Sequence, residues 1–240
     1  MAEPSPVSSL NRELLFEQIH RILWDKIRSG EIQPGQRLRD IEWAQRLNVS
    51  RTPVREAMRK MQQEGVLSLL TSGGYEVRSV SQAELTDLYR CRAALEGLVA
   101  EEVALSFDPD ADARLSDIIQ ACEQAIARED LDAAFELNTR FHGVLIELSR
   151  NTYLKTMCES VSRMIYFYRA SLLNSVKRAE ASRERYLSRI RAKQDQHLEI
   201  LAALRARDGA RASMLVESHI RAIVDLPPRL PAAVGAAQAA

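Results

Sequence analysis

The ten residues from Ser50 to Arg59 constrain the fold of this chain more than any other stretch. They predict a short helix, because Ser50 is a favourable N-cap and Pro53 falls in the first turn, where backbone N–H groups have no helical acceptor. Arg51, Arg55 and Arg59 follow at intervals of four residues, which places them on one face, about 6 Å apart along the axis. One face of this helix is therefore strongly basic.

The opposite face of the same helix is apolar. It is formed by Val54, Ala57, Met58 and Met61, which recur at helical spacing and can attach the helix to a hydrophobic core. A helix divided in this way suits the major groove of DNA, where arginine pairs with guanine edges or phosphates. A solvent-exposed surface helix has the same pattern, because basic amphipathic helices are common. The neighbouring segments therefore decide between the two interpretations.

The segment before Ser50 predicts two helices and a tight turn. Residues 10–29 carry an apolar stripe that ends at Gly30, and residues 40–47 form a second, short helix. Asn48 follows, where a left-handed residue is often needed. Two short helices joined so closely, the second with an arginine face, are typical of a helix-turn-helix. The residues expected to face its core are Leu15, Ile19, Ile22, Leu23, Ile27, Ile41, Ala44 and Leu47.

The segment after the arginine-rich helix predicts a β-hairpin. Residues 66–70 and 75–80 form two short strands, and Gly73 and Gly74 lie in the tight turn between them. A glycine tip carries no side chains, so its backbone can approach a phosphate closely. An ordinary hairpin has the same pattern, but directly after a helix-turn-helix it predicts a wing.

The rest of the chain predicts only helices. Ser81 and Glu84 form a capping box that starts a long helix, and further helices follow without any alternating strand pattern. In the first of them, the residues expected inside are Leu85, Leu88, Leu95, Leu98 and Val99. We therefore expect a mainly α protein with a disordered arm at 1–9, a winged helix-turn-helix with a two-stranded wing at 10–80, an all-α bundle at 81–226 and a flexible tail at 227–240.

The composition limits the function classes. Hydrophobic residues make up 46 % of the chain and aromatic residues only 5 %, which favours helices with a packed core. The net charge is zero, so a nucleic-acid surface has to be local, and residues 36–60 carry seven basic side chains against three acidic ones. The three widely spaced cysteines form no C-x-x-C pair and indicate a reducing cytoplasm. No apolar run approaches the length of a membrane span.

The first third of the sequence resembles the winged helix of the GntR family of bacterial transcription regulators. The motif VSRTPVREA, the following EGVL and the glycine-tipped hairpin carry the resemblance. It implies binding to double-stranded operator DNA by a homodimer whose two heads read a pseudo-palindrome. Carried over position by position, the implied DNA contacts are Arg39, Ser50, Arg51, Thr52, Arg55, Gly73 and Gly74.

Three of the four histidines lie in the second half of the chain, each in a different expected helix. His142 follows Asn138 by four residues, so the two side chains share a helix face. With His197 and His219 from later helices, three imidazoles in one bundle core would form a nitrogen-rich site for a divalent ion. Histidines are also found buried and hydrogen-bonded without a metal, and spacing alone favours that interpretation.

The segments YRCRAALEGLVAEEVA, NTRFH and SHI resemble the FCD domain, the ligand-binding domain of the FadR branch of GntR regulators. The resemblance implies a divalent metal held by Asn138, His142, His197 and His219, with the effector next to it. Asn138 departs from the usual Asp, and its amide oxygen ligates without charge, so we expect weaker or more selective metal binding. Three nitrogens and one oxygen favour Zn²⁺ or Ni²⁺ over Mn²⁺.

Arg92 lies four residues before Glu96 in the first helix of the bundle. The simplest interpretation is an ion pair on an exposed face. The family pattern R-x-x-L-E implies instead that Arg92 faces the ligand cavity and holds an organic acid through two hydrogen bonds. Arg163, Tyr166 and Tyr168 are further candidates for the same cavity.

The sequence as a whole predicts a DNA-binding transcriptional regulator, with repression favoured over activation. A small carboxylate bound beside the metal is expected to control operator binding. One alternative is the same regulator with a metal-free effector pocket, and another is a metal-dependent enzyme with an accessory DNA-binding domain. The chain has no H-E-x-x-H motif and no evident carboxylate base beside the histidines, which argues against the enzyme. The effector, the operator and the regulated genes are not evident from the sequence.

Overall fold

The computed structural model describes residues 14–177 and 180–222. The chain divides into two compact units, the first ending at Ser79 and the second starting at Val80. Each unit buries its own set of hydrophobic side chains and is described by itself. The arm expected at 1–9 and the tail expected at 227–240 lie outside the described residues.

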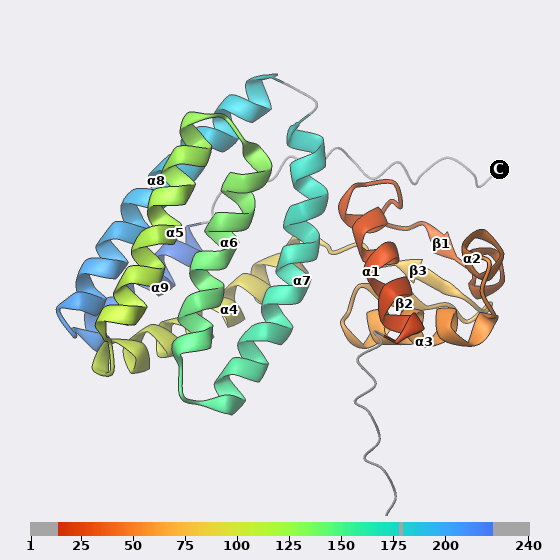
Figure 1. The fold of residues 1–240 in the computed structure, drawn as a ribbon, viewed down its shortest axis with the longest axis horizontal. Helices are drawn as coiled ribbons and strands as arrows, with labels where there is room; N and C mark the ends of the chain where they lie inside the picture. Colours follow the sequence, from red (N-terminus) through yellow and green to blue (C-terminus); the bar gives the residue numbers. More distant parts are fainter. Residues whose placement is uncertain (1–13, 178–179, 223–240) are drawn as a thin grey trace, which may run out of the picture. The chain divides into compact units, whose positions relative to one another are not determined.

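The first unit is a helix-turn-helix followed by a small antiparallel sheet with strand order β1-β3-β2 (Figure 1). Its elements are α1 (Leu15–Arg28), β1 (Arg37–Leu38), α2 (Asp40–Leu47), α3 (Arg51–Gln63), β2 (Leu67–Leu69) and β3 (Tyr75–Val77). The expected wing had two strands, and the structure adds β1 as a third. Gly35 donates to the carbonyl of Val77, and Val77 donates to the carbonyl of Gln36. A two-residue strand has no alternation that a sequence pattern could reveal.

The tight turn between α2 and α3 was predicted at Asn48. This residue is left-handed, with φ of 52°, and its N–H is bonded to the carbonyls of the last turn of α2. Ser50 then has the extended backbone of an N-cap, but its side chain makes no capping hydrogen bond. The start of α3 therefore rests on backbone geometry and on Pro53 in the first turn.

The core of the first unit lies between α1 and α3. Its buried side chains on these helices are Ile19, Leu23, Ile27, Val54, Ala57, Met58 and Met61. Three residues expected inside are exposed instead, namely Leu15 at 46 %, Ile22 at 37 % and Ile41 at 46 %. Helix α1 buries only positions four residues apart, and α2 turns Trp43 inward rather than Ile41.

The second unit is a bundle of helices in every part that the structure describes (Figure 1). The helices are α4 (Gln82–Leu105), α5 (Pro109–Ala127), α6 (Leu131–Leu148), α7 (Thr152–Val176), α8 (Glu180–Arg205) and α9 (Gly209–Arg221). Five of them begin at capping side chains, which are Ser81, Asp108, Asp130, Asn151 and Asp208. The predicted capping box between Ser81 and Glu84 is present.

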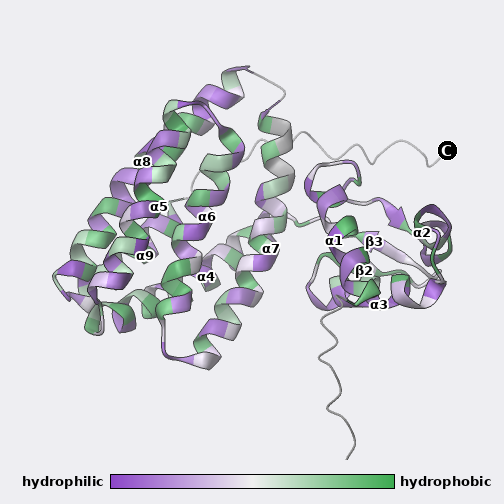
Figure 2. Cartoon of the chain, viewed as in Figure 1, coloured by the Kyte–Doolittle hydropathy of each residue, from purple (hydrophilic) through white to green (hydrophobic). Residues whose placement is uncertain are grey.

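The bundle helices pack around a large hydrophobic cluster and a second, smaller cluster between α5, α6, α7 and α8. Figure 2 shows hydrophobic and hydrophilic residues alternating along these helices, the pattern expected of amphipathic packing. A Cβ at Gly97 would lie 2.7 Å from Cγ of Glu217, so glycine permits the close approach of α4 and α9. Leu98, expected inside, is 45 % exposed. Within the described ranges, no helix is long and apolar enough to cross a membrane.

Candidate functional site

The surface of the first unit that the sequence predicts to contact DNA is one face of α3. Arg51, Arg55 and Arg59 are exposed, as are Ser50 and Thr52. The apolar side of the same helix is fully buried. The predicted division of this helix into a basic face and a packed face is therefore confirmed, and its arginines are free to meet a duplex.

The basic face is partly neutralised by carboxylates at the start of α2. Asp40 accepts from Nη2 of Arg51 at 3.1 Å and pairs with Nε of Arg55 at 3.6 Å. Arg39, just before α2, pairs with Glu42 at 3.7 Å. Only 18 % of the Asp40 side chain is exposed, whereas both of its arginine partners are more than half exposed. One largely buried carboxylate thus pairs with two exposed guanidinium groups.

The tip of the wing requires glycine for two different reasons. Gly73 and Gly74 both have φ above 80°, which L side chains rarely adopt. A Cβ at Gly74 would also lie 3.1 Å from the carbonyl oxygen of Leu38, whereas Gly73 has open space around it. Gly74 therefore allows the wing to approach the segment before α2, and Gly73 leaves the tip bare.

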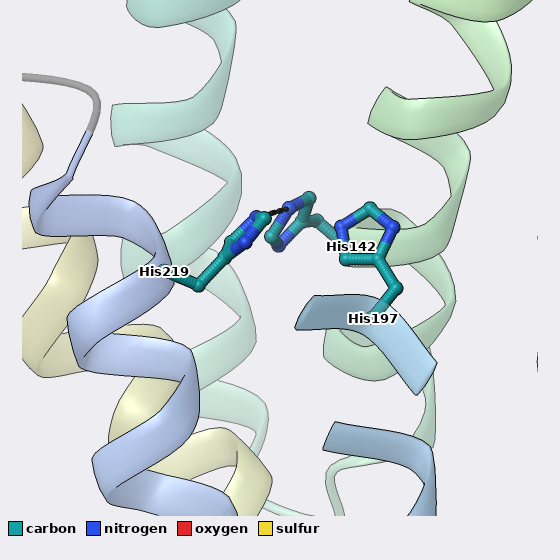
Figure 3. A group of neighbouring side chains, drawn as sticks. All are labelled: His142, His197 and His219. Atoms are coloured by element: carbon teal, nitrogen blue, oxygen red, sulfur yellow. Dashed lines mark hydrogen bonds between the residues drawn. The ribbon is translucent and has the colours of Figure 1, made fainter. Parts of the chain in front are cut away.

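The second unit brings His142 of α6, His197 of α8 and His219 of α9 together (Figure 3). One ring nitrogen from each lies within 4.8 Å of the others, and all three side chains are buried. Nε2 of His142 lies 3.2 Å from Nε2 of His219. The three imidazoles point toward one another, although they come from positions up to 77 residues apart.

The outer ring nitrogens of these histidines each meet an oxygen acceptor. Nδ1 of His142 lies 2.7 Å from Oε2 of Glu96, Nδ1 of His197 lies 2.9 Å from Oε1 of Gln194, and Nδ1 of His219 lies 2.7 Å from Oε1 of Gln196. A neutral imidazole carries one N–H, and these acceptors assign it to Nδ1 in each ring. The Nε2 atoms then carry lone pairs and no hydrogen, and they face the centre. Nε2 of His142 and Nε2 of His219 are therefore at hydrogen-bond distance with no hydrogen between them.

Two buried polar atoms on the helices that carry these histidines lack a partner among the described residues. They are Nε2 of His197 and Oδ1 of Asn138, the residue four positions before His142. Buried polar atoms are rarely left unpaired, because the loss of hydration costs roughly 1–3 kcal/mol for each group. Three nitrogens and one oxygen are a suitable donor set for a divalent transition metal. The four predicted ligands therefore fit a metal ion.

Burial keeps the three imidazoles neutral. Loss of hydration lowers the pKa of His142, His197 and His219 well below 6.5, and the nearby charges of Arg92 and Lys193 lower it further. A metal ion binds only the unprotonated nitrogen. The site is thus in its metal-binding protonation state at neutral pH.

Glu96 is a functional candidate that the sequence analysis missed. The carboxylate is 1 % exposed and joins two buried groups, accepting from Nε of Arg92 at 2.5 Å and contacting the ring of His142. Burial raises the pKa of Glu96, although Arg92 opposes this. The expectation that no carboxylate accompanies the histidines was therefore wrong. The i,i+4 spacing from Arg92 was visible, but its burial was not.

The predicted effector residue, Arg92, is buried rather than exposed, and its pair with Glu96 is internal. A cavity of about 280 Å³ opens beside the histidines, lined by residues of α4, α6, α7, α8 and α9. His219 and Tyr168 lie on its wall. Among the described residues that line it, Arg92, Arg163 and Tyr166 do not occur. Arg92 therefore lies behind the histidine site rather than on the cavity wall.

Comparison with known proteins gives two domain matches. The model for "Bacterial regulatory proteins, gntR family" matches residues 15–77, and the model for "FCD domain" matches residues 87–222. The chain is 30 % identical over 207 residues to the HTH-type transcriptional repressor RspR of Escherichia coli K12, covering 86 % of each chain. It is 31 % identical over 208 residues to the repressor GlaR of the same organism, covering 84 % of this chain and 90 % of that one.

The solved structure of E. coli McbR/YncC is similar to this one. The TM-score is 0.69 at 23 % identity, over 89 % of this chain and 98 % of that chain. At this identity the likeness supports the fold alone.

Proposed function

Because the chain belongs to the gntR family of bacterial regulatory proteins and carries an FCD domain, we propose that it is a repressor controlled by a small carboxylate bound beside a divalent metal. The chain is a transcriptional regulator, since its matched domains and its relatives are regulators rather than enzymes. Repression is the function printed for two of these relatives. A regulator of this kind acts on DNA in the bacterial cytoplasm.

The observation that carries the metal proposal is the unsatisfied centre between the three histidines. Nε2 of His197 and Oδ1 of Asn138 are buried without partners, and the Nε2 atoms of His142 and His219 face each other. A cation between the three rings would satisfy the histidine nitrogens, and Asn138, one helical turn before His142, is proposed to contribute its Oδ1 as the fourth ligand. The donors favour Zn²⁺ or Ni²⁺ over Mn²⁺.

A bound metal would supply an electrophilic site for the carboxylate oxygens of the effector. The residues of this chain hold the surrounding groups in place. Glu96, Gln194 and Gln196 fix the three imidazoles through their Nδ1 atoms, and Gln194 is itself oriented by donating to the carbonyl of Ile119 at 2.9 Å. Asn138 adds no charge, so the site retains more positive charge for an anionic effector than a carboxylate ligand would leave.

The DNA-binding half of the proposal rests on the exposed face of α3. Arg51 and Arg55 would contact base edges or phosphates, with Ser50, Thr52 and Arg39 at the entrance to the groove and the bare tip at Gly73 against the backbone. A homodimer would present two such heads to a pseudo-palindromic operator. Effector binding would shift the population of head placements and thereby change operator affinity.

The test uses the full chain and a duplex that the protein selects from a random pool. Metal-loaded protein is expected to hold close to one equivalent per chain and to release the duplex on addition of a carboxylate. After chelation, the same acid should lose this effect. Fewer than about 0.2 equivalents of metal after supplementation would exclude the metal site and leave the metal-free pocket. If the protein selects no duplex from the pool, the proposal that the winged helix binds operator DNA is wrong.

A further inference from the structure

The cavity beside His219 carries an uncompensated positive charge. Three of its lining side chains are the cations Arg169, Arg189 and Lys193, and the described residues that line it include no Asp or Glu. Arg169 and Lys193 are half-buried, whereas Arg189 is exposed at the same wall. A cavity with this charge fits an anion rather than a neutral sugar or an amine.

These cations have no acidic partner within residues 14–177 and 180–222. Arg169 lies 4.9 Å from the ring centroid of Phe135, which fixes the guanidinium by a cation–π contact without neutralising it. Burial lowers the pKa of Lys193 well below its usual range, and the neighbouring charges of Arg169 and Arg92 lower it further, so an anion bound beside Lys193 would favour its protonated form. Crowded cations of this kind are stabilised by a bound anion.

The remaining wall is mostly apolar and contains unused hydrogen-bond donors. The hydroxyls of Tyr168 and Tyr186 are buried and donate to no acceptor among the described residues, and both residues line the cavity. Tyr168 is 8 % exposed. The apolar lining residues are Leu85, Phe135, Leu173, Val176 and Ile190. A ligand therefore needs acceptor oxygens and a hydrocarbon body.

We propose that this cavity binds an acid with two separate anionic groups joined by a short hydrocarbon segment. One anionic group lies next to His219, and the second is held by Lys193 and Arg169. This inference rests on the proposed function, because the first group is the carboxylate beside the metal. The cavity of about 280 Å³ is at the lower end of ligand-pocket sizes, so the acid is small.

Charge balance favours two anionic groups over one. Imidazole and amide groups ligate a metal without charge, so His142, His197, His219 and Asn138 would leave the full double charge of a divalent metal uncompensated. A monocarboxylate would neutralise part of the metal charge but would leave the ammonium group of Lys193 without a counter-ion. A second anionic group would give Lys193 its ion pair and would accept from the unpaired tyrosine hydroxyls.

The experiment measures calorimetric binding to metal-loaded, full-length protein. Succinate, glutarate and adipate are compared with butyrate, pentanoate and hexanoate, which have the same chain lengths and one carboxylate fewer. The diacids are expected to bind roughly 10-fold or more tightly, because each charge-assisted pair contributes at least that factor. Comparison of 3-phosphoglycerate with glycerate tests whether the second anionic group is a phosphate.

A set of variants assigns the second group to its residue. Lys193→Met is expected to weaken diacid binding roughly 10- to 100-fold and to change monoacid binding less than about 3-fold. Lys193→Arg keeps the charge and should retain most of the preference. Arg191→Met removes an exposed cation of α8 that does not line the cavity, and it is the matched control. Metal content is measured for every variant.

Equal binding of monoacids and diacids would overturn the inference while leaving the proposed function intact. Equal losses for both classes in Lys193→Met would do the same. If the metal-loaded protein binds no acid of the panel, both the inference and the carboxylate effector are wrong. If the protein takes up no metal at all, the metal site of the proposed function is wrong, and this result is distinguishable because metal content is measured separately from acid binding.

Discussion

The winged helix and the bundle place their functional residues in opposite surroundings. In the winged helix, Arg51 and Arg55 are exposed, and their common partner Asp40 is near the surface. In the bundle, His142, His197 and His219 are almost completely buried, and Nε2 of His197 has no partner in the part of the chain that the structure describes. Both regions gather side chains of one chemical type, but only the bundle removes those side chains from water, which costs free energy of hydration.

This difference explains how each region can act. Surface ion pairs contribute only about 0–1 kcal/mol, so the recognition arginines can exchange Asp40 for DNA at little cost. Buried polar atoms have no water to replace a missing partner, so the unpaired Nε2 of His197 would be stabilised by the cation proposed for this centre. The first region is therefore suited to a reversible encounter and the second to a persistent ligand.

The largest expected effect is on the surface side of the comparison. Replacement of Arg51 and Arg55 by Ala together should reduce affinity for the selected duplex roughly 100-fold or more, because each lost base or phosphate contact costs about 1–3 kcal/mol. Fluorescence anisotropy measures the affinity, and circular dichroism checks that the fold is retained. Arg21→Ala with Arg28→Ala on α1 is the matched control. Unchanged affinity in the first variant at physiological salt would refute α3 as the recognition helix.

The next effect concerns pH and should involve the buried region. An unfolded histidine has a pKa of about 6.5, whereas burial lowers the pKa of all three bundle histidines well below this. Below about pH 6.5 the unfolded chain therefore binds protons that the folded, metal-free chain does not. The free energy of unfolding of the metal-free protein is therefore highest above this pH. It falls as the pH is lowered, by up to roughly 1.4 kcal/mol per histidine per pH unit.

Thermal unfolding of chelated protein between about pH 7.5 and about pH 5.5 measures this loss, because ordinary carboxylates do not titrate in that range. Glu96 acts in the opposite direction, since burial raises its pKa, and this reduces the net slope. A His142→Gln, His197→Gln, His219→Gln triple variant is the control and should show a weaker slope. The same melting temperature at both pH values in the parent protein would contradict buried neutral histidines.

A smaller effect is expected from the carboxylate that orients one ligand. Glu96→Gln retains the shape but weakens the acceptor for Nδ1 of His142, so metal affinity should fall roughly 10- to 100-fold. Competition with a chromogenic chelator measures it. Glu102→Gln, on the same helix but bonded to Ser149 and Asn151, is the control. Equal metal affinity in both variants would remove Glu96 from the site.

The smallest effect is expected at Asp40. Asp40→Asn releases Arg51 and Arg55 from their shared carboxylate and removes one negative charge from this surface. Binding to unselected DNA should become about 2- to 5-fold stronger, which is within the range of a surface ion pair. The selected duplex should gain less, because Asp40 no longer orients the two guanidinium groups. Glu42→Gln, which frees only Arg39, is the control. Equal gains on both duplexes would mean that Asp40 adds charge but no orientation.

Local patterns were sufficient for the first unit. The turn at Asn48, the basic face of α3 and the glycine tip at Gly73 all depend on residues within a few positions of one another. The wrong predictions in this unit concern residues at the margin of an apolar helix face and a strand too short to show a pattern. Ile22 and Ile41 lie on flanks of their helices, and β1 is too short for any periodicity.

The bundle site was predicted differently. Its four ligands were implied by a resemblance, whereas spacing alone favoured ordinary buried histidines. Glu96 is 46 residues from the histidine it contacts, and the carbonyl that orients Gln194 is 75 residues from it. No sequence period spans such distances, so these partners were missed.

The sequence by itself determined where the helices begin and end, which face of α3 is basic and which residue types are available for a metal. Those properties follow from hydrogen bonds and side-chain spacing within one or two helical turns. The tertiary structure alone decided that three distant imidazoles meet, that Arg92 pairs inward with Glu96, and that three cations share one cavity. Burial and long-range packing produce those arrangements, because they depend on how whole helices lie against one another.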